Sequence, residues 1–134
     1  MYLYSVILIS LCAALFYIRV SPTDVARWHQ PIQGSEDVDL QGGAVRVLPA
    51  DAMALARVDA AAMALPRTVR LAGSVDQGRI TYRTRSKVIG FPDFTTVEYK
   101  DGQLKMFARL RFGRSDFGVN AARLKRLQRA AVGP

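Results

Sequence analysis

The chain has almost none of the side chains on which common catalytic and metal sites depend. Among 134 residues there is one cysteine, Cys12, and one histidine, His29. A single cysteine excludes a disulfide within the chain and a cysteine metal site. With one histidine, the residues offer at most a weak all-oxygen metal site. We therefore expect no catalytic residues, no metal and no cofactor.

Charge is absent from the first 18 residues. The run from Tyr2 to Ile18 also has no proline and no glycine, and as a helix it would rise about 25 Å, the short end of what spans a bilayer. A cleaved signal peptide needs basic residues before the apolar run and a small-x-small cleavage site, and both are missing. Leu11, which precedes Cys12, is too large for the usual lipoprotein cleavage site. We interpret residues 1–18 as a retained transmembrane anchor.

Basic residues are scarce after this run and become abundant later. Residues 19–78 have six Lys and Arg against seven Asp and Glu, whereas residues 79–134 have thirteen against four. An anchored domain with a basic half is biased toward anionic partners, of which lipid headgroups and acidic protein surfaces are nearest. A solvated surface that keeps the domain soluble is the alternative. Nucleic acid is not expected, because an anchored protein does not suit it.

Residues 19–43 are rich in turn-forming residues and have no sustained periodicity, which predicts a linker or juxtamembrane segment. Within it, Ser21–Asp24 can start one helical turn. Trp28 and His29 either lie at the headgroup level beside the anchor or pack on the domain. The folded domain is then predicted to comprise residues 44–134.

This domain is predicted to be α+β. Apolar residues recur every three or four positions between Asp51, a possible cap, and Pro66, which predicts a helix with one buried face. A second helix is predicted over about 120–131, burying Leu124 and Leu127. Alternation between the helices predicts strands. The fold class is therefore α+β: one N-terminal transmembrane helix, then a two-layer domain with an antiparallel sheet of about four to five strands packed against two helices.

The dipeptide Asp101-Gly102 predicts a two-residue hairpin turn. It sets Lys100 opposite Gln103, Glu98 opposite Lys105, and Val97 opposite Met106, so that a charged pair meets on one face and apolar residues meet on the other. The same alternation places cations on the sheet face away from the helices. The predicted partner- or anion-binding residues are Arg79, Arg83, Arg85, Lys87, Lys105, Arg109 and Arg111, with Arg114 in the loop that follows.

The stretch FGRSDFGVN (112–120) gathers polar residues before the last helix. Nucleophilic catalysis by Ser115 would need a base, and the only histidine, His29, lies in the predicted linker. Asp116 is the immediate neighbour of Ser115 and could not act on it as a positioned triad would. Val119-Asn120 follows the second glycine where a phosphate loop needs Lys and Ser or Thr. We interpret the stretch as a strand-to-helix turn in which Ser115 or Asp116 caps the helix. Asp116 is expected to pair with the nearby arginines Arg111, Arg114 and Arg123.

Two blocks, TRSKVIGFPD (84–93) and RFGRSDFGVNAARL (111–124), resemble the signature of a bacterial family known as domain of unknown function 1499. The resemblance covers roughly residues 66–127, and SPTDVARWH (21–29) is similar to the family as well. The signature positions carried over are Ser86, Phe91, Asp93, Arg111, Gly113, Ser115, Asp116, Gly118, Asn120 and Arg123. Ala108 and Leu110 depart from the serines common before Arg111, and Pro92 stands in place of one acidic residue of a pair. These departures argue against a polar site along that strand and leave the turn unchanged.

The resemblance implies a location but no activity, because the family has none established. Its members resemble small envelope proteins, which implies the bacterial inner membrane with a single span and a periplasmic domain. Arg19 and Arg27 beside the anchor favour a cytoplasmic domain instead.

The sequence-based hypothesis is a membrane-anchored, non-catalytic accessory or interaction protein. Its basic sheet face would dock onto an inner-membrane protein complex or anionic lipid headgroups. One alternative is a small-ligand binder in which Arg85, Arg111 and Arg114 hold a carboxylate or phosphate. Another is a hydrolase built on Ser115 and Asp116.

Overall fold

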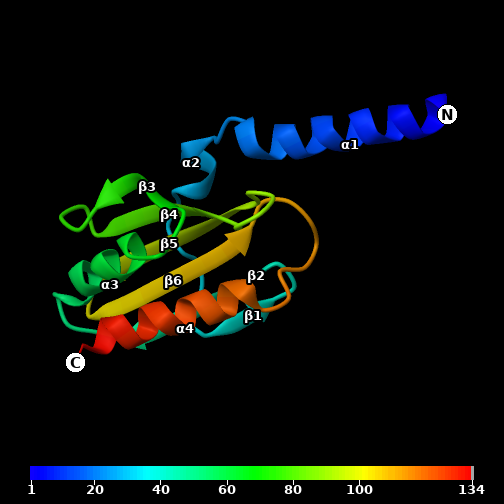
Figure 1. Cartoon of the computed structure of the whole chain (residues 1–134). Helices are drawn as coiled ribbons and strands as arrows, with labels where there is room; N and C mark the ends of the chain where they lie inside the picture. The colour runs from blue at the N-terminus through cyan, green and yellow to red at the C-terminus, as the bar shows by residue number, and fades with distance from the viewer. Residues whose placement is uncertain (134) are drawn as a thin grey trace.

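The computed structural model describes residues 1–133. Helix α1 (Tyr2–Val20) projects from one end of the molecule (Figure 1), and none of its residues is buried. By length and composition α1 can cross a membrane, although a signal sequence near an N-terminus has the same properties. The structure therefore confirms one apolar N-terminal helix.

The rest of the chain is built on a six-stranded antiparallel sheet. The strands are β1 (Val38–Leu40), β2 (Gly43–Pro49), β3 (Thr68–Ser74), β4 (Arg79–Arg85), β5 (Pro92–Lys100) and β6 (Gln103–Leu110), in the order β1-β2-β6-β5-β4-β3. The prediction of four to five strands is wrong, because β1 lies in the expected linker. Its three residues are exposed and too few to show a period of two, and they become a strand only by pairing with β2.

Residues 1–133 contain three further helices: α2 (Val25–Trp28), α3 (Ala54–Met63) and α4 (Val119–Val132). Two of them, α3 and α4, lie side by side on one face of the sheet (Figure 1), as predicted. Leu55 and Val58 of α3 and Leu124 and Leu127 of α4 are fully or almost fully buried there, among sheet residues such as Val97. Each such side chain contributes about 1.5–3 kcal/mol through removal from water.

The predicted hairpin register is confirmed. Lys100 lies opposite Gln103, Glu98 opposite Lys105, and Val97 opposite Met106. The predicted Glu98–Lys105 ion pair is wrong. Glu98 instead pairs with Arg79, its partner on the other neighbouring strand, at 2.6 Å, and Lys105 Nζ donates to the Gly34 carbonyl.

Residues 21–34, here named the docked segment, cover part of the second sheet face. Trp28 stacks on Phe94 with ring centroids 4.2 Å apart and is 8% exposed. Ile32 is also buried, and Thr96 Oγ1 donates to the Trp28 carbonyl. Of the two alternatives for Trp28, packing on the domain is the one observed.

Candidate functional site

Three of the predicted docking cations are engaged by Glu98 or by the docked segment. Arg79 pairs with Glu98, and Lys105 bonds the docked segment at Gly34. Arg109 donates to the Trp28 carbonyl at 2.5 Å, and its guanidinium lies 5.3 Å from the centroid of the Trp28 ring and 4.5 Å from that of Phe107. Burial lowers the pKa of Arg109 to about 10. The prediction of a bare basic face is therefore wrong at these three positions, because the docked segment engages Lys105 and Arg109, and Glu98 pairs with Arg79.

Four other arginines converge near the C-terminal end of α1 and form what we name the arginine cluster: Arg19, Arg83, Arg85 and Arg111. Burial lowers the pKa of Arg85, and the positive charges of the other three lower it further. Arg85 Nη1 donates to Gly90 O at 3.0 Å and lies 3.5 Å from Ile18 O, at the end of α1. The ion pairs within residues 1–133 involve Arg46, Arg57, Arg70, Arg79 and Arg123, so no cluster member has a carboxylate within 4.0 Å.

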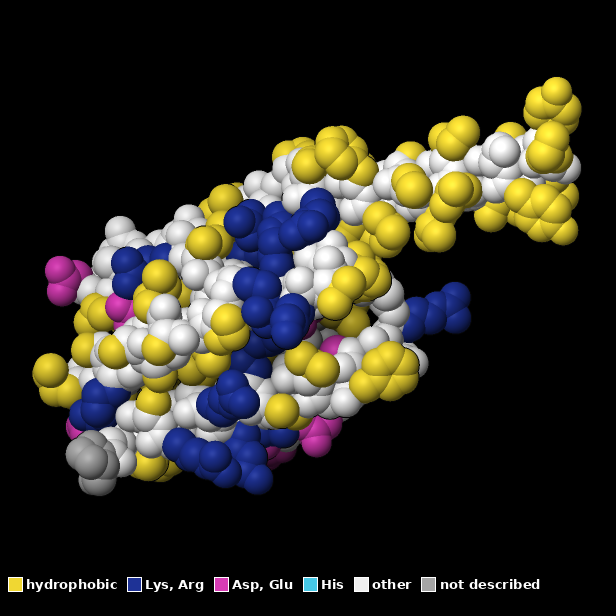
Figure 2. Space-filling model, viewed as in Figure 1, with side chains coloured by type: hydrophobic (Ala, Val, Ile, Leu, Met, Phe, Trp, Pro, Cys, Tyr) yellow, Lys and Arg dark blue, Asp and Glu magenta, His cyan; other side chains and the backbone are white. Residues whose placement is uncertain are grey.

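The end of α1 lies against the loops that carry this cluster. Tyr17 meets Phe112 edge to face with ring centroids 6.3 Å apart. A Cβ added at Gly90 would come within 3.0 Å of Arg19 Nε, so the 86–91 loop approaches the helix closely. Figure 2 shows basic side chains gathered below the point where apolar α1 joins the domain. The remaining predicted cations, Lys87 and Arg114, are exposed on loops that follow β4 and β6.

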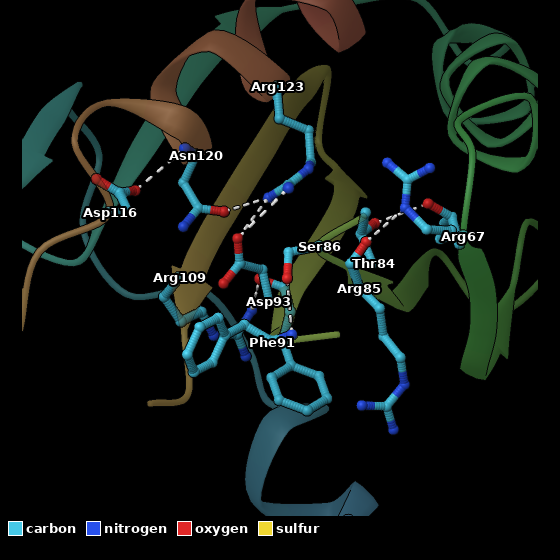
Figure 3. A network of polar contacts seen from close by, with 12 residues as sticks. Arg67, Thr84, Arg85, Ser86, Phe91, Asp93, Arg109, Asp116, Asn120 and Arg123 are labelled. Carbon is cyan, nitrogen blue, oxygen red and sulfur yellow. Dashed lines mark hydrogen bonds and ion pairs between the residues drawn. The ribbon is translucent and has the colours of Figure 1, made fainter. Parts of the chain in front are cut away.

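The signature residues form a hydrogen-bonded network at the same end of the sheet (Figure 3). Arg123 reaches from α4 to Asp93 on β5, with Nη1 and Nη2 at 3.3 and 3.4 Å from Oδ2, and it also donates to Asn120 Oδ1. Burial raises the pKa of Asp93, the Arg123 guanidinium opposes that shift, and the Asp116 carboxylate adds to it. The Arg85 side chain points away from this network, toward α1.

Three further signature side chains hold the backbone of the two loops. Ser86 Oγ accepts from the backbone N–H groups of Gly90 and Phe91, which closes the loop between β4 and β5. Asp116 accepts from the N–H groups of Gly118 and Asn120 and caps α4, and Ser115 Oγ accepts from that of Phe117. The expected ion pairs of Asp116 with arginine are wrong, because Arg123 pairs with Asp93 and Asp116 is in none of the ion pairs found in residues 1–133.

The geometry gives no support to a hydrolytic role for Ser115. The ring nitrogen Nδ1 of His29, the single histidine, lies 2.8 Å from Thr81 Oγ1. Thr81 bonds Thr96, which bonds Trp28, so His29 lies on the sheet face opposite α4. A nucleophilic serine needs a base within hydrogen-bond reach. His29 lies on the other side of the sheet and is not within reach of Ser115.

A cavity of about 460 Å³ lies beneath the loop between β6 and α4. Seven of the ten signature residues line it, so we name it the signature pocket: Ser86, Phe91, Asp93, Gly113, Ser115, Asp116 and Arg123. Arg111, Gly118 and Asn120 do not line it. The pocket is also lined by Arg67, Phe112 and Phe117, which are not among the predicted site residues. Arg67 and Phe117 differ from most non-glycine residues in having positive φ angles. A sequence pattern does not reveal backbone angles, so it could not have identified these two residues.

No curated protein matches the chain. The family model described as "Protein of unknown function (DUF1499)" matches residues 20–130, which include the docked segment, all six strands and most of α4. The match agrees with the resemblance carried by the two signature blocks, and the chain belongs to the DUF1499 family of proteins of unknown function.

Proposed function

We propose that this chain is a membrane-anchored, non-catalytic interaction protein whose arginine cluster binds anionic lipid headgroups beside its own anchor. The observation that carries the proposal is the cluster itself: Arg19, Arg83, Arg85 and Arg111 lie together without a carboxylate partner at the end of α1. Like charges held close together repel, and a phosphate placed among them would relieve that repulsion.

The position of the cluster favours headgroups over other anions. If α1 spans a bilayer, its last turn, which contains Arg19, lies at the headgroup level. Arg85 bonds the backbone at that turn, so the neighbouring cations lie at the same depth. A basic side chain near an anionic surface contributes about 1 kcal/mol to membrane binding.

The proposed location is the bacterial inner membrane, with one span and the domain on the periplasmic side. The apolar α1 supports the span, and the envelope location is what the resemblance of the two signature blocks to small envelope proteins implies. Alkaline phosphatase fused after Pro134 should be active in cells, because that enzyme folds only where disulfides form. An inactive fusion alongside a fluorescent cytoplasmic reporter fusion would contradict the proposed orientation.

The headgroup proposal is tested by lipid retention. The full chain is purified in micelles that contain phosphatidylcholine and phosphatidylglycerol, and bound lipids are counted by native mass spectrometry. The double substitution Arg83→Gln with Arg85→Gln should lower phosphatidylglycerol retention about thirtyfold, since two contacts of about 1 kcal/mol each are lost. The control, Lys125→Gln with Arg129→Gln, removes the same amount of charge from exposed positions of α4. It should change phosphatidylglycerol retention little.

Equal phosphatidylglycerol retention by the Arg83/Arg85 variant and the unmodified protein would contradict the proposal. A stoichiometric acidic membrane protein that co-purifies and is lost with the same double substitution would favour docking onto a protein complex instead.

A further inference from the structure

The signature pocket continues into a second cavity, and the two form one groove. The second cavity, of about 270 Å³, lies between the Leu65–Arg67 turn and α4. Both are lined by Arg67, Thr84, Val119 and Arg123. The larger cavity alone falls within the range of about 300–1,000 Å³ that is usual for small-molecule sites.

The two ends of this groove differ in chemistry. The end beneath the β6–α4 loop has an apolar wall made of Phe91, Leu110, Phe112, Phe117 and Val119. Asp93, Asp116 and Arg85 also line this end, but Asp93 is paired with Arg123, and Asp116 and Arg85 bond the backbone. The other end is lined by Arg67, Arg123 and Arg126 beside the apolar residues Leu65, Pro66 and Ala122, and no acidic residue lines it. One apolar end and one cationic end are complementary to an amphiphile whose head is an anion.

The cations at the basic end are available to a ligand. Arg123 is occupied by Asp93, but Arg67 and Arg126 take part in none of the ion pairs of residues 1–133. Arg67 Nε donates to the Arg85 carbonyl, which fixes the guanidinium. Its two terminal nitrogens have no acceptor among residues 1–133. Arg126 is exposed.

Backbone strain marks both ends of the groove. Three non-glycine residues within positions 1–133 have positive φ angles: Arg67 at 55°, Asp101 at 52° and Phe117 at 52°. Asp101 is the first residue of the hairpin turn, where this angle is expected. Arg67 and Phe117 both line the groove, and a bulky residue adopts this conformation only where its surroundings require it. Strain of this kind is common at ligand sites.

We propose that the groove binds an amphiphile with one anionic head, held by Arg67 and Arg126, and an acyl chain that lies along Leu110, Phe112 and Val119. Phe112 contacts Tyr17 of α1, so the apolar end of the groove opens beside the proposed bilayer. The ligand is a free fatty acid or an anionic membrane lipid, which share this chemistry. The proposed head site uses Arg67 and Arg126, which are not members of the arginine cluster, whereas Arg85 of the cluster lines the apolar end of the groove and bonds the Gly90 carbonyl.

The test is photolabelling of the full chain in phosphatidylcholine nanodiscs. One sample receives a fatty acid with a diazirine in its chain, and another receives phosphatidylglycerol with the same group in one acyl chain. Labelled residues are mapped by peptide mass spectrometry, and labelling of α1 serves as the internal reference. Labelling of Leu110, Phe112 and Val119 supports the proposal, and the probe that produces it identifies the source of the ligand.

Labelling confined to α1 with both probes would overturn the proposal. Labelling of Phe117 without Leu110 or Val119 would also overturn it, because Phe117 is 93% exposed and would then be inserted in the bilayer rather than cover a ligand.

Two variants separate binding from folding. Arg67→Gly removes the guanidinium and relieves the positive φ angle, so groove labelling should fall at least tenfold while the melting temperature is not lowered. Arg126→Gln removes the second cation from an exposed position and should lower groove labelling without affecting the fold. Arg129→Gln makes the same charge change on α4 outside the groove and should leave labelling unchanged. Unchanged groove labelling in both Arg67→Gly and Arg126→Gln would refute the head site.

Discussion

Asp116 organises the turn between β6 and α4 with its two carboxylate oxygens. Oδ1 accepts the Gly118 N–H at 2.9 Å and Oδ2 accepts the Asn120 N–H at 3.1 Å. Gly118 directly precedes α4 and Asn120 lies in its first turn, where backbone N–H groups have no partner within the helix. Most of the signature around it is similarly engaged, because Ser86 and Ser115 also accept backbone N–H groups. The signature therefore builds the walls of the pocket more than it supplies free reactive groups.

We predict that Asp116→Ala lowers the free energy of unfolding by about 1–2 kcal/mol, because a cap of this kind contributes that much. The measurement is denaturant unfolding followed by circular dichroism. Ser115→Ala is the matched control, since it removes a single bond at 3.2 Å to an exposed turn, and it should cost less. Equal losses for the two variants would show that Asp116 has no special role in the turn.

At the scale of elements, the docked segment depends on a few polar contacts with the sheet. Its carbonyl at Trp28 accepts from both Thr96 and Arg109, and His29 bonds Thr81 at 2.8 Å. The pKa of His29 is lowered from its ordinary value of 6.5, first by burial and then by the positive charge of Arg79. A positive charge on His29 is therefore unfavourable while the segment is docked.

We predict that the segment detaches more readily as the solution becomes acidic. A base with a lowered pKa in the folded state binds its proton more tightly when unfolded, so the stability is present above pH 6.5 and is lost as the pH falls below it. Trp28 is the only tryptophan, so its fluorescence reports the segment directly. Its emission should shift to the red between about pH 8 and pH 5, the range in which histidine titrates.

The control for this pH dependence is His29→Gln, which has no ionisable group at this position. Its Trp28 emission should stay constant over the same range. A pH-dependent shift that persists in His29→Gln would assign the effect to another group.

At the scale of the whole molecule, the arginine cluster and the signature pocket lie at the same end. The strand order explains this arrangement, because β5 runs antiparallel to its neighbours β4 and β6. The C-terminal ends of β4 and β6 and the N-terminal end of β5 therefore lie at the same end of the sheet, and α1 leaves the domain beside it. The Asp101-Gly102 turn lies at the opposite end of the sheet. The molecule thus directs both proposed binding sites toward the proposed membrane.

We predict that the docked segment and the sheet unfold as one cooperative unit at neutral pH. Trp28 is stacked on Phe94 of β5, so its release requires exposure of the sheet face. In nanodiscs, the denaturant midpoint from Trp28 fluorescence should coincide with the midpoint from far-ultraviolet circular dichroism, because coincident transitions indicate a two-state change. A clearly lower midpoint for Trp28 would show that residues 21–34 behave as an independent linker.

The sequence by itself determined the features that depend on neighbours close along the chain. The apolar run of α1, the buried faces of α3 and α4, and the register set by Asp101-Gly102 all follow from spacings of two, three or four residues. The signature residues were also identified from the sequence, because the two blocks that carry them are contiguous.

Only the tertiary structure decided which charged residues are available for binding. Alternation placed Arg79, Arg83, Lys105 and Arg109 on one face, but the docked segment engages Lys105 and Arg109, and Glu98 pairs with Arg79. Arg67 joined the groove through a positive φ angle and a contact with β4, which no local pattern encodes. The physical reason is that burial and pairing depend on segments distant in sequence, whereas periodicity records only the face to which a side chain belongs.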